Sequence, residues 1–158
     1  MTMISIQRPG MESLDVHFVL IDLEGTLAMD GRIHPKAKDK VNLLSKRASI
    51  YILTKSDREK VEKTLTKMKV EVLYVTEGNS SQQKLNVLQR LGPHQTAVIG
   101  NGLDDVQIME QAGLGMCVIG KEGSSTETMA KADLVVTNVL DALDFLLKPL
   151  RQGATLGR

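Results

Sequence analysis

The sequence predicts an α/β fold with three layers, in which a mostly parallel sheet is covered by helices on both faces. Short β-branched or apolar runs alternate with segments of helical character along the chain. The connections between them are about 2 to 6 residues long, as expected for compact right-handed crossovers between parallel strands. The run 18–21 is apolar throughout, which is typical of a parallel strand buried on both faces.

The strands that we predict are apolar or β-branched runs bounded by turn residues. They cover residues 3–6, 16–21, 49–53, 71–75, 96–99, 115–119 and 134–136. The helices that we predict cover residues 35–46, 57–68, 81–91, 104–112, 125–131 and 140–147. Pro35 suits the first position of a helix, and Gly92-Pro93 is a typical helix stop.

Two further segments are predicted from local composition. Asp30-Gly31 lies between apolar-flanked arms, which indicates a tight turn and a small hairpin over residues 27–33. Residues 151–158 are poor in apolar side chains. We therefore expect one domain over residues 1–150, followed by a flexible tail.

The composition sets limits on partners and location. The 158 residues include 20 Lys and Arg against 19 Asp and Glu, so the formal charge of +1 gives no general attraction to nucleic acid or to an anionic membrane. The sequence has neither a signal-peptide core at residues 1–10 nor an apolar run of about 18 residues. Cys117 is the single cysteine and cannot form an internal disulfide. We expect a cytoplasmic protein that binds neither nucleic acid nor membrane.

Carboxylates follow the first central strand. The run 18–21 ends at Asp22-Leu23-Glu24-Gly25-Thr26. In open α/β sheets, ligands bind in the crevice outside the carboxyl ends of the strands. Asp22 and Glu24 are therefore the first candidates for chemistry.

Three later segments also place polar groups at strand ends or helix starts. Thr54 follows the strand 49–53, where its hydroxyl would either help to hold an anion or cap the next helix. Lys84 lies in the first turn of a predicted helix, where a cation is unfavourable for the helix dipole, although most such lysines are solvated. The strand 96–99 runs into Gly100-Asn101-Gly102-Leu103-Asp104-Asp105, whose two acids would either cap a helix or bind a ligand.

Together and in this order, the four segments resemble the motifs of the haloacid dehalogenase (HAD) superfamily of phosphotransferases. Within that superfamily they are similar to the phosphorylation domain of P-type ATPases and its soluble relatives. The matching segments are Asp22-Leu23-Glu24-Gly25-Thr26, Leu53-Thr54 with Lys55-Ser56-Asp57, Lys84, and Gly100-Asn101-Gly102-Leu103-Asp104-Asp105. The resemblance covers about residues 14 to 148. It implies a Rossmann-like, HAD-type fold.

The resemblance also implies a mechanism and a set of site residues. Asp22 would attack phosphorus to form an aspartyl-phosphate, with Glu24 as general acid and base. Catalytic support would come from Thr54 and Lys84. The phosphate of a phosphorylated substrate would be bound by Gly25, Thr54, Lys55 and Lys84. Magnesium (Mg2+), which prefers oxygen ligands, would be held by Asp22, Glu24, Asn101 and Asp105.

Two residues depart from the family pattern. Glu24 stands in place of a second Asp, and its extra methylene moves the carboxyl by about 1.5 Å. A misplacement near 1 Å can cost about 10²-fold in rate. Asn101 stands in place of an acid that would bind the metal. We therefore expect a slow phosphatase, or alternatively a catalytically weakened regulatory module that binds phosphate or metal. A receiver-like signalling domain is a third reading, which the order of the motifs disfavours.

The family's cap domains enter either after the first motif or between the second and third. The segments from Thr26 to Thr54 and from Thr54 to Lys84 are too short to hold one. We therefore expect an open site. Such a site needs another lid, so we predict a homo-oligomer in which the hairpin 27–33 or the C-terminal tail reaches a neighbour's site.

Overall fold

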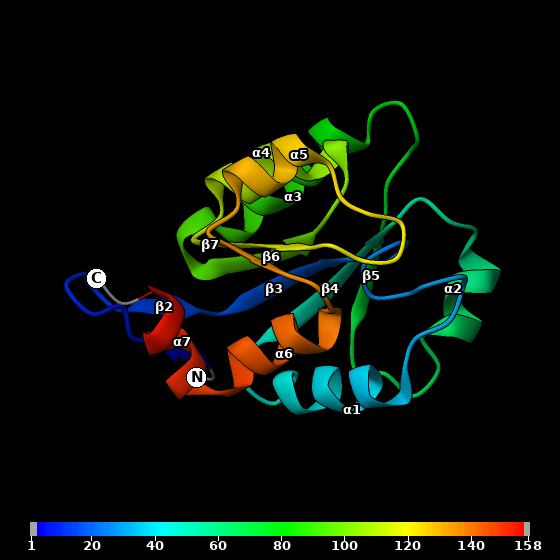
Figure 1. Cartoon of the computed structure of the whole chain (residues 1–158). Helices are drawn as coiled ribbons and strands as arrows, with labels where there is room; N and C mark the ends of the chain where they lie inside the picture. The colour runs from blue at the N-terminus through cyan, green and yellow to red at the C-terminus, as the bar shows by residue number, and fades with distance from the viewer. Residues whose placement is uncertain (1–2, 157–158) are drawn as a thin grey trace.

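The computed structural model describes residues 3–156, and its centre is a six-stranded sheet with the order β5-β4-β3-β6-β7-β8 (Figure 1). The strands are β3 (Phe18–Asp22), β4 (Ser49–Thr54), β5 (Glu71–Tyr74), β6 (Thr96–Gly100), β7 (Leu114–Val118) and β8 (Leu134–Val136). Every neighbouring pair in this sheet is parallel. The carboxyl ends of β4, β3 and β6, which carry the predicted motifs, therefore meet at one edge of the sheet.

Helices cover both faces of this sheet, which confirms the predicted three-layer α/β fold (Figure 1). One face carries α3 (Ser80–Leu91), α4 (Val106–Gln111) and α5 (Thr126–Lys131), and the other carries α1 (Pro35–Leu44) and α6 (Val139–Leu147). The short helix α2 (Arg58–Thr64) joins the α1 side of the core through Val61. No inserted cap domain interrupts these elements within the described residues. None of the helices in residues 3–156 has the length and apolar character needed to span a membrane.

The alternation of side chains along β3 explains why both faces are covered. Val19 and Ile21 belong to the larger core cluster on the α1 and α6 side, whereas Leu20 belongs to the cluster on the α3 and α4 side. Successive side chains of a strand point to opposite faces, so an apolar run needs partners on both. All three residues are fully buried, and they hold the carboxyl end of β3 in place.

The predicted strand 16–21 is wrong in its start, because the structure divides this region at His17. Residues before it form β2 (Leu14–Val16), which pairs antiparallel with β1 (Ile4–Ile6) in a separate two-stranded sheet. The His17 N–H donates to the Gln95 carbonyl, and the His17 carbonyl accepts from the Ser49 N–H. These two hydrogen bonds hold the chain where it leaves the two-stranded sheet and enters the six-stranded sheet.

The predicted hairpin is confirmed by a closed turn. Met29 and Arg32 exchange both backbone hydrogen bonds, at 2.9 and 3.0 Å. Asp30 and Gly31 between them have φ of 51° and 76°. Positive φ at both central residues is the conformation of a type I′ turn, for which Asp-Gly is a preferred pair.

The flexible tail predicted for residues 151–158 differs from the structure, in which this segment up to Leu156 belongs to α7 (Pro149–Leu156). Gln152 is buried, and its Nε2 donates to the Phe145 carbonyl at 2.9 Å. The Gln152 amide therefore ties α7 to the end of α6, a contact that the low apolar content of this segment does not indicate. Residues 157–158 lie outside the described residues.

An ion-pair cluster on Asp144 joins α1 to α6. Asp144 is buried, and its Oδ1 lies 2.6 Å from Lys40 Nζ. Burial by itself would raise the Asp144 pKa, but the hydrogen bond and charge of Lys40, with help from Lys148 and Arg151, hold the pKa below its ordinary value of 3.8. Because the folded-state pKa is lowered, this carboxylate stabilises the fold above the unfolded-state pKa, and the stabilisation disappears as the pH falls through the folded-state pKa.

Asp144→Asn is therefore expected to lower the free energy of unfolding at neutral pH by about 1.5–3 kcal/mol, the range for a hydrogen bond to a charged group. The difference in the free energy of unfolding between Asp144→Asn and wild type should shrink as the pH falls below about 4. Urea unfolding from neutral pH down to this range measures the difference. Asp141→Asn is the matched control, because Asp141 lies on the same helix but is half exposed and 3.5 Å from its Arg151 partner. Equal losses in both variants would contradict the role assigned to burial.

Candidate active site

Asp22 is the last residue of β3 and lies at the carboxyl edge of the sheet. Its side chain is 12% exposed, and its Oδ1 lies 3.2 Å from Lys84 Nζ. This carboxylate is nearly buried, lies at the carboxyl edge of the sheet and contacts an ammonium group. The sheet, rather than a mobile loop, therefore holds it in position.

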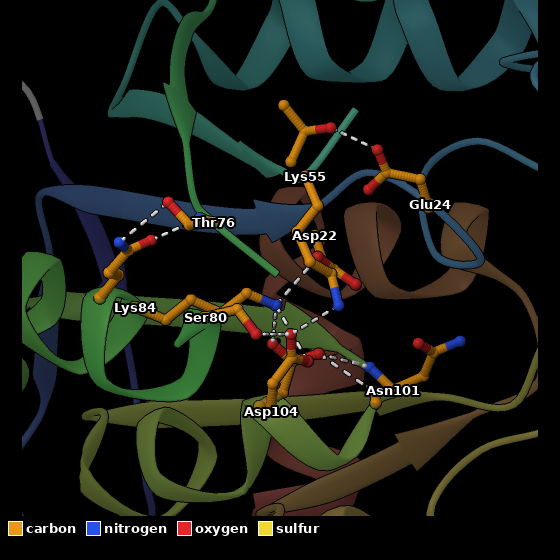
Figure 2. A network of polar contacts seen from close by, with 12 residues as sticks. Asp22, Glu24, Lys55, Thr76, Ser80, Lys84, Asn101 and Asp104 are labelled. Atoms are coloured by element: carbon orange, nitrogen blue, oxygen red, sulfur yellow. Dashed lines mark hydrogen bonds and ion pairs between the residues drawn. The ribbon is translucent and has the colours of Figure 1, made fainter. Parts of the chain in front are cut away.

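Lys84 is the hub of the polar network (Figure 2). Its side chain is only 1% exposed, and its Nζ also lies 2.8 Å from Asp105 Oδ1 and 3.1 Å from Asp104 Oδ1. Lys84 is on the second turn of α3, a helix whose apolar residues Leu85 and Leu88 are buried against the sheet. The packing of α3 therefore carries the ammonium group to the carboxyl ends of β3 and β6.

Asp105 is fully buried and orders the loop after β6. Its Oδ2 accepts the backbone N–H groups of Asn101 and Gly102, each at 3.1 Å, while its Oδ1 contacts Lys84. Both carboxylate oxygens are thus occupied. Asp105 positions Lys84 and the loop, and it has little capacity left for another ligand.

The close approach of Asp105 requires glycine at position 100. A Cβ there would lie 2.5 Å from Asp105 Oδ2 and 2.8 Å from its Cγ. Gly100→Ala should therefore displace Asp105 and lower the free energy of unfolding by about 1–3 kcal/mol, as overpacking does. Gly153→Ala is the control, because no atom lies within 4 Å of a Cβ at that position. Chemical denaturation measures both variants, and an unchanged stability of Gly100→Ala would contradict the rigid placement of Asp105.

The network carries an excess of negative charge. Burial raises the pKa of Asp22 well above its ordinary value, the charge of Asp105 raises it further, and Lys84 offsets only part of this. Burial likewise raises the pKa of Asp105. Burial alone would lower the pKa of Lys84, but the neighbouring acids, Asp105 first, raise it, so Lys84 stays protonated. One ammonium does not fully compensate the acids that surround it.

Glu24 and Thr54 form a second group beside this network. The Thr54 and Ser56 hydroxyls both donate to Glu24 Oε1, and the Ser56 N–H donates to Thr54 Oγ1 at 3.0 Å. Thr54 ends β4, the strand next to β3, and is fully buried. The Glu24 side chain therefore extends toward the loop after β4 rather than toward Lys84 (Figure 2).

The other predicted site residues have defined backbone or side-chain partners. Gly25 has φ of 76°, and its N–H donates to the Ala28 carbonyl, so this N–H is not free to bind a phosphate. Asn101 Nδ2 donates to the Gly25 carbonyl at 2.7 Å. Lys55 Nζ lies 3.2 Å from Asp104 Oδ2, on the exposed side of the network.

Two residues in these contacts, Ser56 and Ser80, were not assigned a role from the sequence, and Asp104 was predicted only as one of two acids that would cap a helix or bind a ligand. Ser80 Oγ donates to Asp104 Oδ2 at 2.7 Å, and Asp104 bridges Lys84 and Lys55. The signals were present, because Ser80 is one helical turn before Lys84 and the other two lie inside the quoted motifs. What the sequence did not indicate is that α3 brings Ser80 against the loop after β6.

The donor atoms of this edge suit a hard divalent cation. Asp22 Oδ2 and Asn101 Oδ1 take part in no hydrogen bond with the residues that the structure describes. Within residues 3–156, no three His, Cys, Asp or Glu side chains form a ready metal cluster. Free oxygen ligands and surplus negative charge both favour the binding of Mg2+.

A family model described as haloacid dehalogenase-like hydrolase matches residues 6–113. The chain belongs to this family. The match includes the four segments on which the resemblance was based. The site described above is therefore formed by the motif residues of a haloacid dehalogenase-like hydrolase.

Solved structures similar to this hydrolase share its fold. The 3-deoxy-D-manno-octulosonate 8-phosphate phosphatase of Moraxella catarrhalis, solved with magnesium, phosphate and its sugar acid, has a TM-score of 0.71 and 15% identity over 85% of this chain and 87% of that one. The putative enzyme of this kind from Vibrio cholerae has a TM-score of 0.70 and 17% identity over 94% and 97%. The cobalt-bound phosphatase of Haemophilus influenzae has a TM-score of 0.69 and 15% identity over 89% and 91%.

Two uncharacterized proteins of Methanocaldococcus jannaschii are similar to parts of this hydrolase in sequence. One is 40% identical over 82 residues, which are 49% of this chain and 88% of the relative. The other is 44% identical over 41 residues, which are 26% of this chain and 93% of the relative. Both are shorter than this chain, and their names state no activity.

Proposed function

We propose that this hydrolase is a magnesium-dependent phosphatase or phosphotransferase that acts through an aspartyl-phosphate on Asp22. The observation that carries the proposal is the contact between the Asp22 carboxylate and the buried Lys84 ammonium at the open carboxyl edge of the sheet. A carboxylate nucleophile divides one difficult displacement into two easier ones. The ammonium group supplies positive charge where negative charge develops on the phosphoryl oxygens.

The proposed reaction has two steps. In the first, an Asp22 oxygen attacks phosphorus, the bond from phosphorus to the substrate alcohol breaks, and protonated Glu24 gives its proton to the departing oxygen. In the second, water attacks the aspartyl-phosphate, its proton passes to Glu24, and inorganic phosphate leaves. Asp22 is then again a carboxylate and Glu24 is again protonated, so the cycle is balanced.

Magnesium, when bound, would neutralise the phosphoryl oxygens and the surplus acids, with Asp22, the backbone carbonyl of Glu24 and Asn101 as the residues that hold it. The Glu24 side chain is less suited to this role because Thr54 and Ser56 direct it away. Thr54, Lys84 and the loop residue Lys55 would bind the phosphate of the substrate. Before that binding, Lys55 must leave its half-exposed ion pair with Asp104.

A panel of p-nitrophenyl phosphate and common phosphometabolites tests the proposal. Hydrolysis is expected with magnesium and is expected to disappear when EDTA removes the metal, because the uncompensated carboxylates would repel an anionic substrate. Hydrolysis that is unchanged by EDTA and by Asp22→Asn would contradict the proposal.

A second candidate function is a weakened regulatory module, and one observation favours it. Asn101 uses its Nδ2 to hold the Gly25 carbonyl instead of offering a second carboxylate, and Glu24 is directed toward the loop after β4. In this reading Asp22 binds or retains a phosphoryl group without rapid turnover. Stable binding of beryllofluoride together with no hydrolysis of any substrate would support the module over the phosphatase.

The double variant Glu24→Asp with Asn101→Asp separates the two readings further. An acid at position 101 would place a carboxylate next to the Gly25 carbonyl, so the variant should be more stabilised by magnesium than wild type, as seen in its melting temperature. We expect turnover to rise severalfold if these residues slow the site. The single variants are the controls. Unchanged turnover with clear magnesium binding would show that the two replacements are not what limits the rate.

We further propose a cytoplasmic homo-oligomer in which a neighbouring copy covers the open site. The support is the absence of a cap among the described elements and the exposed tip of the hairpin, residues 30–32, beside the site. Sedimentation at micromolar concentration tests it. A sharply monomeric profile would contradict the oligomer and leave the chemistry at Asp22 unaffected.

A further inference from the structure

A cavity of about 250 Å³ lies on the other side of the hairpin from Glu24. Its walls come from the hairpin, from the loop after β7 and from the start of α6, and its residues include Thr26, Arg32, Lys121 and Asn138. We call it the hairpin cavity. Neither Asp22 nor Lys84 lines it, and the proposed reaction does not use it.

The charged side chains that line the hairpin cavity have one sign. Its lining includes Arg32, Lys121 and His34 but no Asp or Glu. Within residues 3–156, neither Arg32 nor Lys121 forms an ion pair. Two unpaired cations over an acid-free cavity produce a positive potential that attracts an anion.

Two polar features inside the cavity also lack full partners. Thr26 is 2% exposed, and its Oγ1 has no hydrogen-bond partner among the described residues, which is unusual for a buried hydroxyl. The nine-residue helix α6 begins at the cavity wall, where Asn138 caps the Leu140 N–H and the Val139 N–H donates to none of the described residues. A helix N-terminus adds positive potential, and its free N–H is a donor for an anion.

Apolar side chains make up much of the remaining lining, which favours a ligand with an apolar body. They are Leu27, Met29, Val118, Val139 and Leu140. Small-molecule sites combine such apolar walls with a few placed polar groups. The volume suits a compact body rather than a nucleotide or a peptide.

The hairpin cavity and the cavity beside Glu24 share no lining residue. A Cβ at Gly120 would lie 3.2 Å from the Gly25 carbonyl oxygen, so the two glycine segments are in close contact. On the far side, a second cavity of about 260 Å³ touches Glu24 and contains the acids Asp30 and Glu122. This second cavity, which Lys60 also lines, carries a surplus of acids that the hairpin cavity lacks.

We propose that the hairpin cavity is a binding site for a small organic anion with a compact apolar body, separate from the phosphoryl site at Asp22. Arg32 and Lys121 hold the charged end, together with the start of α6, and the leucine, valine and methionine side chains enclose the apolar body. Because Thr26 lines this cavity and Gly25 borders the active site, the ligand contacts the same loop that carries Glu24.

The probe for the test is benzoate, with uncharged benzamide as its matched control. Benzoate is titrated into the whole chain while the methyl resonances of Leu27, Met29, Val118 and Val139 are followed by NMR, with and without beryllofluoride at Asp22. Saturable shifts at these methyls are expected for benzoate, are expected to persist with beryllofluoride, and are expected to be much weaker for benzamide. The readout does not depend on activity, so its failure is distinguishable from failure of the proposed function.

The double variant Arg32→Ala with Lys121→Ala is expected to weaken benzoate binding at least about tenfold, which corresponds to about 1.4 kcal/mol. Lys46→Ala with Arg47→Ala is the control, because it removes the same charge from exposed positions outside the cavity. The proposal is overturned by an absence of saturable shifts, by equal binding of benzamide, by shifts that beryllofluoride abolishes, or by equal weakening in the control variant.

Discussion

Asp22→Asn is expected to lower phosphatase turnover by at least about 10³-fold, or about 4 kcal/mol of transition-state stabilisation, while the fold is retained. The amide cannot form the aspartyl-phosphate. It also removes a carboxylate whose pKa is raised, first by burial and then by Asp105, so the folded state no longer holds an unfavourable charge. In EDTA, the variant should be at least as stable as wild type.

Both halves of this expectation are measured on one preparation, by steady-state kinetics with magnesium and by thermal unfolding in EDTA. Ser56→Ala is a useful comparison, because Ser56 contacts Glu24 but not Asp22. Its effect on turnover should be far smaller than that of Asp22→Asn. A loss of stability in Asp22→Asn that matches its loss of activity would indicate a structural role for Asp22 instead of a chemical one.

Lys84→Met is expected to remove activity and also to destabilise the fold by about 3–5 kcal/mol at neutral pH, since breaking a buried ion pair leaves uncompensated buried charge. Asp22, Asp104 and Asp105 would then face one another without the ammonium between them. Burial raises the pKa of Asp22 and of Asp105, and Lys84 lowers both, so without Lys84 these two carboxylates are expected to bind protons more readily in the folded state than in the unfolded chain. The variant should therefore regain stability relative to wild type as the pH falls.

Urea unfolding in EDTA at about pH 5 and about pH 7 measures the difference in the free energy of unfolding between Lys84→Met and wild type. This difference should be smaller at the lower pH. Lys55→Met is the matched control, because Lys55 pairs with the same Asp104 but is 39% exposed. An exposed pair of this kind contributes about 0–1 kcal/mol. Equal effects of the two lysine variants would contradict the central position given to Lys84.

Much of the fold could be predicted because its signals are local. The apolar run ending at Asp22 needs partners on both faces of a sheet, and the alternation of strands and helices leaves few other arrangements. The division at His17 could not be predicted, because it depends on a hydrogen bond with Gln95, far along the chain. The helical end of the chain was also missed, because its packing depends on Gln152, a residue type that is usually exposed.

The meeting of Asp22, Lys84 and Asp105 was predictable for a similar reason. Adjacent parallel strands end at one edge, so residues that follow β3 and β6 lie close together whatever their separation in sequence. The orientation of Glu24 was not predictable, since it depends on two hydroxyls in the neighbouring loop. The occupation of both Asp105 oxygens likewise depends on the exact path of the loop after Gly100.

The central claim is that Asp22 accepts the phosphoryl group. The most direct measurement is to react the magnesium-loaded protein with a small phosphoryl donor, reduce the acyl phosphate with borohydride, and locate the reduced residue by mass spectrometry. The account predicts homoserine at position 22, and none in Asp22→Asn or when beryllofluoride blocks the site beforehand. Turnover of phosphate esters with no modification at position 22, or with the modification on another acid, would contradict it.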